Sequence, residues 1–153
     1  MLVSKAIIYR HFIVISTISI QVIKKGRHSA YTLHCHIVFV TKYRKKVIGA
    51  IHLKRLHEIF SEICQKFDAK LTDFNGEADH VHLLVEFSPN TPAIAKLINS
   101  LKAVSSRRLR QEFCDISGSF RKPVLWSRSY FAGSCGGAPL EVIKEYIENQ
   151  DQP

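Results

Sequence analysis

The chain has 153 residues, 46% of them hydrophobic, which suits one compact domain with a buried core. Its 22 Lys and Arg against 13 Asp and Glu give a formal net charge of +9 and a pI near 9.6, so a polyanionic partner is expected, with nucleic acid ahead of an anionic membrane surface. The four cysteines form no C-x-x-C pair, which excludes a zinc knuckle or a dithiol redox motif and favours reduced cytosolic thiols.

The sequence of the N-terminal segment fits more than one interpretation. Lys5 and Arg10 precede a short apolar stretch over 12–20, which superficially resembles a signal peptide but lacks a small-residue cleavage site. The stretch is shorter than the roughly 20 apolar residues that a membrane-spanning helix needs. It fits an added strand, or an extension translated from upstream of the natural start. We expect 1–23 to be an N-terminal extension and 24–153 to form a single domain.

The first half of that domain shows one helical and three strand patterns. Alternating apolar residues predict a strand over 31–40, and a helical period predicts an amphipathic helix over 51–67. Strands follow over 70–74 and 80–87, joined by the turn chemistry of Asn75-Gly76, so that they form a hairpin.

The second half begins with a helix that opens at Thr91-Pro92 and has a basic outer surface. A loop over 117–123 leads to a strand over 125–132, and a glycine-rich segment precedes a last helix near Pro139. The order β-α-β-β-α-β-α predicts an α+β, ferredoxin-like (RRM-like) fold, which is an antiparallel sheet with two helices on one face, plus the C-terminal helix. The other sheet face is left for function.

Two histidine pairs lie on that other face. His80 and His82 point to the same side of their strand, two residues apart, where two imidazoles can share one cation. An H-x-H pair alone also fits a structural or surface role. His34 and His36 lie on the first strand, which a ferredoxin-like sheet places beside the third. They either support the site or line the open face or a subunit contact.

The predicted last helix places Tyr146 and Gln150 four residues apart, and hence on one face. By itself this spacing is also satisfied by a tyrosine that packs against the domain with its hydroxyl in water. The spacing indicates a functional site only when it is combined with the histidine pair on the strand.

Two motifs, DHVHLLV over 79–85 and YIENQ over 146–150, resemble the TnpA-like single-tyrosine HUH (histidine, hydrophobic, histidine) transposases of bacterial insertion sequences, the insertion sequence 200/605 family. Similar stretches occur at 25–28, 39–44 and 130–140, and the match covers roughly 24–152. The resemblance implies that metal is held by His80, His82 and Gln150, with Asp79 in support. It implies that Tyr146 is the nucleophile that becomes joined to the 5′ phosphate of the cut strand.

The implied activity is that of a transposase that cleaves and rejoins single-stranded DNA at insertion-sequence ends through a 5′-phosphotyrosine. Two imidazoles and one amide oxygen leave positions open for water and DNA oxygens, which suits Mg²⁺ or Mn²⁺ better than a closed zinc site. The resemblance further implies a homodimer that recognises DNA hairpins. The expected location is the cytoplasm, at the nucleoid of a bacterial or archaeal cell, with no membrane partner.

Basic residues along the chain are candidates for phosphate contacts, although many charged residues serve only solvation. The candidates are Lys42, Arg44, Lys45, Lys46, Lys102, Arg107, Arg108, Arg121 and Lys122. Three aromatic residues, Tyr43, Trp126 and Tyr130, either stack on unpaired bases or pack in the core.

Three alternatives stay open. The first is a non-catalytic ferredoxin-like nucleic-acid binder, although the aromatic residues that such proteins carry on their central strands are histidines here. The second is a metal-dependent hydrolase that activates water. The third is a domesticated relative that processes repeat hairpins without moving an element.

Overall fold

The computed structural model describes residues 24–25, 30–31 and 33–134. The N-terminal extension, the predicted last helix, Tyr146 and Gln150 lie outside these described residues. Among the described helices, none combines the length and apolar character needed to cross a membrane.

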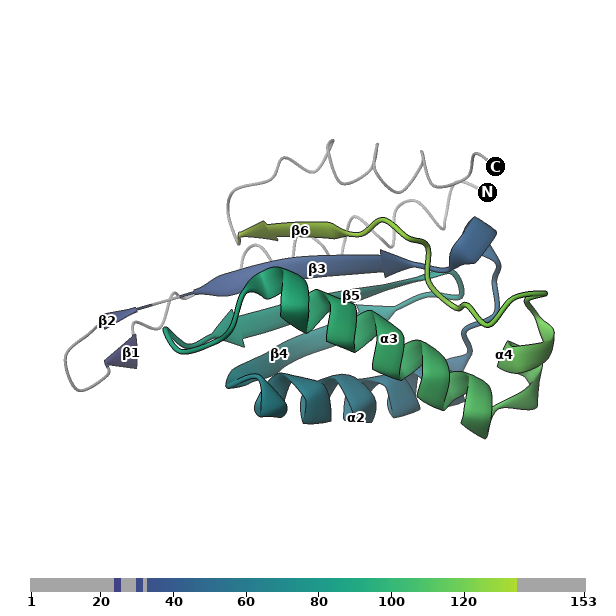
Figure 1. Cartoon of the computed structure of the whole chain (residues 1–153), viewed down its shortest axis with the longest axis horizontal. Helices are drawn as coiled ribbons and strands as arrows, with labels where there is room; N and C mark the ends of the chain where they lie inside the picture. Colours follow the sequence, from purple (N-terminus) through teal and green to yellow (C-terminus); the bar gives the residue numbers. More distant parts are fainter. Residues whose placement is uncertain (1–23, 26–29, 32, 135–153) are drawn as a thin grey trace.

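A four-stranded antiparallel sheet has the order β4-β5-β3-β6 (Figure 1). Its strands are β3 (His34–Val40), β4 (Ala69–Gly76), β5 (His80–Phe87) and β6 (Phe131–Ser134). A separate pair is formed by β1 (Lys24–Lys25) and β2 (Ala30–Tyr31). As predicted, the first and third strands of the ferredoxin-like sheet, β3 and β5, are neighbours.

Two long helices cover one face of the sheet (Figure 1), which confirms the predicted α+β fold. They are α2 (Ala50–Lys66) and α3 (Ile94–Glu112), and the short elements are η1 (Lys42–Arg44), a 3-10 turn, and α4 (Cys114–Gly118). The first long helix begins after Gly49, whose N–H is accepted by Nδ1 of His52 at 2.9 Å. That bond satisfies one of the backbone donors left open at a helix start.

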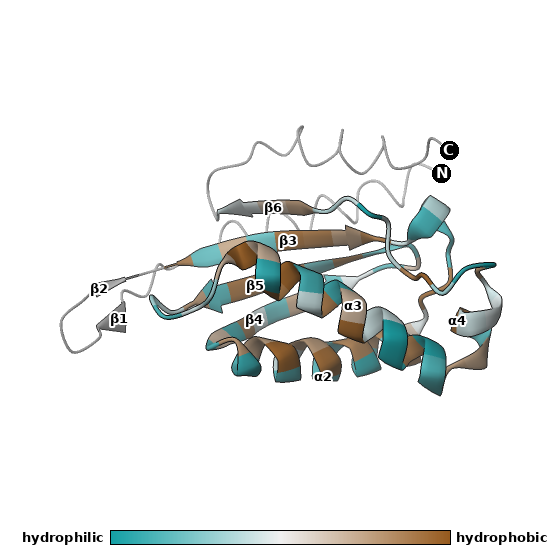
Figure 2. Ribbon diagram, viewed as in Figure 1, coloured by the Kyte–Doolittle hydropathy of each residue, from teal (hydrophilic) through white to brown (hydrophobic). Residues whose placement is uncertain are grey.

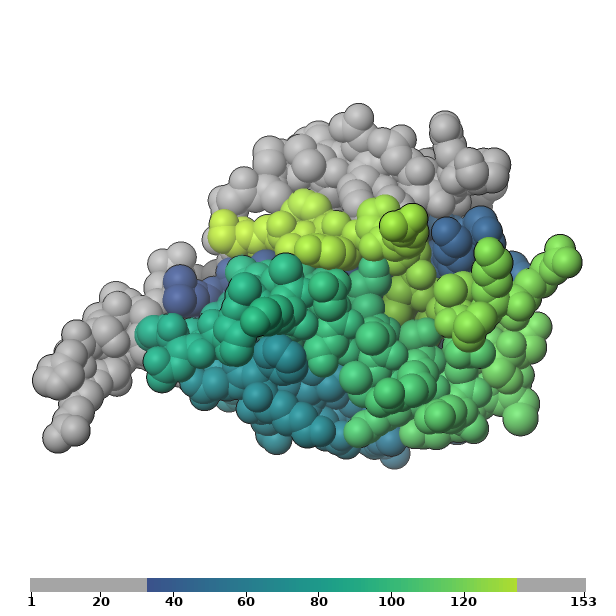
Figure 3. All heavy atoms as spheres, in the orientation of Figure 1, coloured from purple at the N-terminus to yellow at the C-terminus, as the bar shows by residue number. Residues whose placement is uncertain are grey.

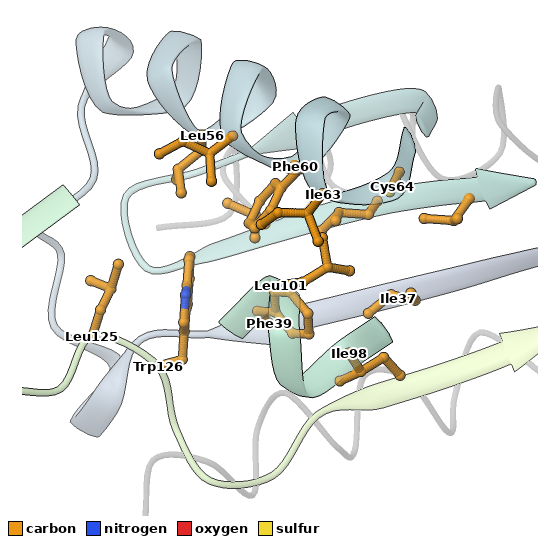
Figure 4. Packing of buried hydrophobic residues seen from close by; sticks show 14 of the residues in the cluster. Ile37, Phe39, Leu56, Phe60, Ile63, Cys64, Ile98, Leu101, Leu125 and Trp126 are labelled. Carbon is orange, nitrogen blue, oxygen red and sulfur yellow. The ribbon is translucent and has the colours of Figure 1, made fainter. Parts of the chain in front are cut away.

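The core lies between the helices and the sheet, where the apolar side of each helix meets the strands (Figure 2). Phe39 of β3 packs edge-on against Phe60 of α2, with ring centroids 6.0 Å apart, and contacts Trp126 at 5.7 Å. Figure 4 shows Leu101 of α3 entering the same cluster. The indole Nε1–H of Trp126 donates to Ser105 Oγ at 2.8 Å, so its polar atom is satisfied in the core.

Three local predictions differ from the structure. Asn75 and Gly76 are strand residues that pair with His82 and Val81, and the turn falls at 77–79 instead, because strand pairing outweighs the local preference for an Asn-Gly turn. The strand expected over 125–132 begins only at Phe131, since the preceding chain makes a single bridge, from Trp126 to Thr41. The loop expected at 117–123 starts with the end of α4.

Gly76 is required by close packing rather than by a turn. A Cβ added there would lie 2.7 Å from Leu53 Cδ2, 2.8 Å from Val81 Cγ1 and 2.9 Å from the backbone oxygen of His80. We expect Gly76→Ala to destabilise the protein by about 1–3 kcal/mol, because either the core or β5 must move. Denaturant unfolding checks this, with Gly118→Ala as the control because no atom lies within 4 Å of its added Cβ. Equal stability of both variants would contradict the packing account.

Candidate metal centre

β5 positions both histidines of the H-x-H motif. His80 pairs with Val40 of β3 and His82 pairs with Val38, while the alternate residues Val81 and Leu83 join the core. Since side chains alternate along a strand, both imidazoles lie on the face opposite the helices, as predicted. His80 is 1% exposed, so its ring is deeply buried.

The two ring nitrogens of His80 have different surroundings. Nδ1 lies 2.6 Å from Oδ1 of the buried Asp79. Nε2 is also buried, and within the described part of the chain it has no hydrogen-bond partner. A buried polar atom without a partner is costly, and a histidine that gives Nδ1–H to a carboxylate is oriented to bind metal through Nε2.

Asp79 is held from a second side by Arg44. The Nε and Nη2 atoms of this guanidinium lie 3.1 and 3.0 Å from Oδ2 of Asp79. Burial acts to raise the pKa of Asp79, but the hydrogen bond with His80 and the charge of Arg44 outweigh it and hold that pKa below its usual range. The carboxylate is therefore charged at neutral pH and accepts from both neighbours.

The geometry of the two rings fits a shared cation. The ring centroids of His80 and His82 are 5.0 Å apart, and the planes are nearly perpendicular at 85°. Two imidazole nitrogens each about 2.1 Å from one metal lie roughly 3 Å apart at a right angle, which rings at this separation can reach. The burial of His80 and the relative orientation of the two rings therefore fit a divalent ion.

The two histidines of the second pair, which lie two residues apart on β3, have different neighbours. His36 stacks on His82, with centroids 5.3 Å apart, whereas His34 lies at the other end of β3, 3.8 Å from Glu86. His34 pairs with Glu86 and His80 pairs with Val40. At about 3.4 Å per residue, the backbones of His34 and His80 are therefore roughly 20 Å apart. Of the second pair, His36 therefore lies beside the candidate site and His34 lies away from it.

His36 adds no charge to the site. Burial lowers its pKa to about 4, and the nearby Asp73 offsets only part of this effect. The ring is therefore neutral at pH 7, so it packs against His82 without placing a positive charge beside a cation.

Glu77 is a candidate site residue that the sequence prediction missed. Its carboxylate, Asp79 and His80 offer ligand atoms that all lie within 4.8 Å of one another. The backbone N–H of Glu77 also donates to the carbonyl of His80 at 2.8 Å, which closes the turn between β4 and β5. The available signal was its place three residues before His80, but the turn had been assigned to Asn75-Gly76.

Several basic candidates for DNA binding are already engaged within the protein. The Lys45 ammonium donates to the carbonyl of Ser119, and Arg108 of α3 lies 2.6 Å from Glu62 of α2. Lys102 donates to the carbonyl of Arg128 at 2.6 Å. Lys46, Arg107, Arg121 and Lys122 are exposed, as is Lys45, and Lys42 lies over the Tyr43 ring at 4.9 Å.

The three aromatic candidates differ in how far their rings are exposed. Trp126 is a core residue, and Tyr130 is partly buried with the Lys102 ammonium 5.6 Å from its ring centroid. Tyr43 is 65% exposed and is the one of the three that offers its ring to solvent. Figure 3 shows its turn, in blue, on the surface beside the yellow-green segment that leads into β6.

A family model described as transposase IS200 like matches residues 29–150. The chain belongs to the IS200-like transposase family. This family is one of DNA-processing enzymes, and its match spans both the histidine strand and the predicted tyrosine helix.

Individual relatives agree with this IS200-like assignment. The transposase for insertion sequence element IS200 of Salmonella typhimurium is 27% identical over 127 residues, which are 83% of this chain and 82% of the relative. A crystal structure of a Deinococcus radiodurans protein assigned as a transposase is 29% identical, with a TM-score of 0.73, and covers 85% of this chain and 99% of its own. A REP-associated tyrosine transposase bound to a REP hairpin shares the fold at 8% identity and a TM-score of 0.51, covering 84% and 68% of the two chains.

Proposed function

We propose that this IS200-like transposase cleaves and rejoins single-stranded DNA at insertion-sequence ends through a 5′-phosphotyrosine formed on Tyr146. A divalent ion, Mg²⁺ or Mn²⁺, is bound by His80 and His82, with Gln150 as the third protein ligand. The observation that carries the proposal is the orientation of His80, whose Nδ1 faces Asp79 while its buried Nε2 has no partner among the described residues. Family membership supports the DNA substrate and the strand-transfer chemistry.

The proposed ligands act by binding and orientation. His80 offers Nε2 and His82 a second imidazole, while Asp79 fixes the His80 ring through Nδ1. His36 packs against His82 and supports its ring. The bound ion would polarise the scissile phosphate and offset the charge that develops on its oxygens.

Tyr146 provides the nucleophile. A free phenol has a pKa near 10 and is a poor nucleophile at neutral pH, so it must lose its proton as it attacks. The Tyr146 oxygen forms a bond to phosphorus, the bond from phosphorus to the 3′ oxygen breaks, and that oxygen gains a proton. The resulting 3′ hydroxyl can attack the phosphotyrosine in turn, which restores a DNA linkage and frees the phenol.

Strand binding would use basic residues outside the ligand set. Lys42 begins the turn beside the site and Lys45 follows it, and the backbone N–H of Lys42 donates to Leu125 O at 2.8 Å, which brings the loop with Arg121 and Lys122 close. Arg107 and Arg108 lie on α3, in the helix layer on the opposite side of the sheet from the histidines, and would contact DNA away from the cut. A homodimer, hairpin recognition and action in the cytoplasm complete the proposal.

The test uses single-stranded oligonucleotides that carry candidate hairpin ends from the DNA flanking the gene. The protein is incubated with Mg²⁺, Mn²⁺ or EDTA and separated under denaturing conditions. We expect a protein–DNA adduct with either ion and none with EDTA. Cleavage without an adduct would instead indicate a hydrolase that uses water, and binding without cleavage would indicate a non-catalytic nucleic-acid binder. A domesticated hairpin-processing relative would give the same adduct, and it would be recognised by the absence of inverted repeats around its gene.

A further inference from the structure

Arg44 is a basic residue whose side chain points into the protein rather than toward a partner outside it. Its guanidinium holds Asp79, which in turn holds His80. We propose that Arg44 is a positioning residue that fixes, through Asp79, the tautomer and orientation of His80. The metal role of His80 rests on the function proposed above, but its tautomer is a property of the metal-free protein and can be measured separately.

The carboxylate of Asp79 divides its two oxygens between two partners. Nε and Nη2 of the guanidinium both contact Oδ2, whereas Nδ1 of His80 lies 2.6 Å from Oδ1. An anchored Oδ2 leaves Oδ1 facing the imidazole, which therefore carries its proton on Nδ1. Without the guanidinium, the carboxylate can rotate and the preference for that tautomer weakens.

The backbone turn that carries Arg44 is also hydrogen-bonded to Asp79. Arg44 has a φ of 48° and Tyr43 a φ of 59°, both in the left-handed region that side chains other than glycine rarely adopt. The turn is held by Arg44 N–H to the carbonyl of Thr41 at 3.0 Å, and by Thr41 N–H to the carbonyl of Asp79 at 2.9 Å. A strained conformation persists only where its surroundings fix it. Here the two hydrogen bonds fix the turn in a position from which the guanidinium reaches Asp79.

The rival role for Arg44 is a contact with a DNA phosphate. Its side chain is only 23% exposed and is paired with a buried carboxylate, unlike the exposed Arg121 and Lys122. A phosphate contact would have to compete with Asp79 for the same guanidinium. The two roles also predict different losses, because a phosphate contact acts on DNA affinity without metal, whereas positioning acts on the imidazole and on the metal.

The experiment compares the full-length protein with Arg44→Ala, Arg44→Lys and the control Arg55→Ala. Arg55 is a suitable control because it makes a two-pronged pair with Glu112 in the helix layer, with contacts of 2.6 and 2.9 Å, away from the histidines. Long-range ¹H–¹⁵N NMR of the metal-free proteins reports the His80 tautomer. Electron paramagnetic resonance titration with Mn²⁺ reports metal affinity, and fluorescence anisotropy without metal reports single-stranded DNA affinity.

We expect His80 to carry its proton on Nδ1 in the wild type and to change to a mixture of tautomers in Arg44→Ala. Mn²⁺ affinity should fall about 10-fold in this variant, while Arg55→Ala changes neither readout. Arg44→Lys keeps the charge but not the planar fork, so a loss of about threefold is expected. If Arg44→Ala does not fold, the lysine variant decides by the same readouts.

The proposal is overturned if the wild-type His80 carries its proton on Nε2. It is also overturned if the Arg44 variants keep the wild-type tautomer and Mn²⁺ affinity, or if they lose only DNA affinity. A wild-type protein that binds no Mn²⁺ contradicts the proposed function instead, and the tautomer readout then decides the role of Arg44 alone.

Discussion

Replacing Tyr146 with phenylalanine is expected to abolish the covalent protein–DNA adduct and to lower strand cleavage by on the order of 10⁴-fold or more. The substitution removes only the oxygen that would bond to phosphorus, so single-stranded DNA binding and Mn²⁺ binding should both persist. Quantitative gel analysis of adduct and cleaved strand under single-turnover conditions checks the loss.

Tyr130→Phe is the matched control for that experiment, because it removes the same atom from a partly buried tyrosine of the segment leading into β6. This control should cleave at close to the wild-type rate. An adduct that survives Tyr146→Phe would show that another residue is the nucleophile, and the proposed mechanism would then be wrong.

Replacing His80 with alanine is expected to lower cleavage by about 100-fold or more and to weaken Mn²⁺ binding at least as strongly. The variant removes Nε2 from the site and also leaves Oδ1 of Asp79 without its 2.6 Å partner. Binding of single-stranded DNA should be largely retained, because basic residues elsewhere provide it. Cleavage rates, Mn²⁺ titration and DNA anisotropy measured on one preparation separate these effects.

His34→Ala is the control for the His80 variant. This histidine also lies on the sheet face opposite the helices, but it pairs with Glu86 at the other end of β3. Its replacement should therefore cause a much smaller loss of cleavage. Thermal unfolding of each variant excludes loss of fold as the cause. Equal losses in the two variants would refute the assignment of His80 as a ligand and indicate that this sheet face is sensitive as a whole.

The parts of the site that follow from strand alternation could be predicted from the sequence. His80 and His82 share a face with His36 because residues two apart on a strand point the same way, and the register of β3 with β5 brings the rings together. The ferredoxin-like arrangement followed likewise from the order of helical and strand patterns.

The parts that depend on contacts distant in the sequence could not be predicted. The pair of Arg44 and Asp79 joins residues 35 positions apart, and it relies on a left-handed turn that no local pattern announces. Glu77 was missed for a related reason, since pairing of Gly76 with Val81 moved the turn toward His80. Each was decided by tertiary contacts that outweigh local preference.

The most direct test of the central claim is the identity of the DNA end that becomes joined to the protein. A single-stranded hairpin substrate labelled separately at each end is cleaved with Mn²⁺, and the adduct is digested and mapped by mass spectrometry. The 3′-labelled fragment should migrate with the protein, bonded through its 5′ phosphate to a peptide that contains Tyr146, while the other fragment ends in a free 3′ hydroxyl. Attachment of the 5′-labelled fragment, or release of both fragments without any adduct, would contradict a tyrosine transposase mechanism.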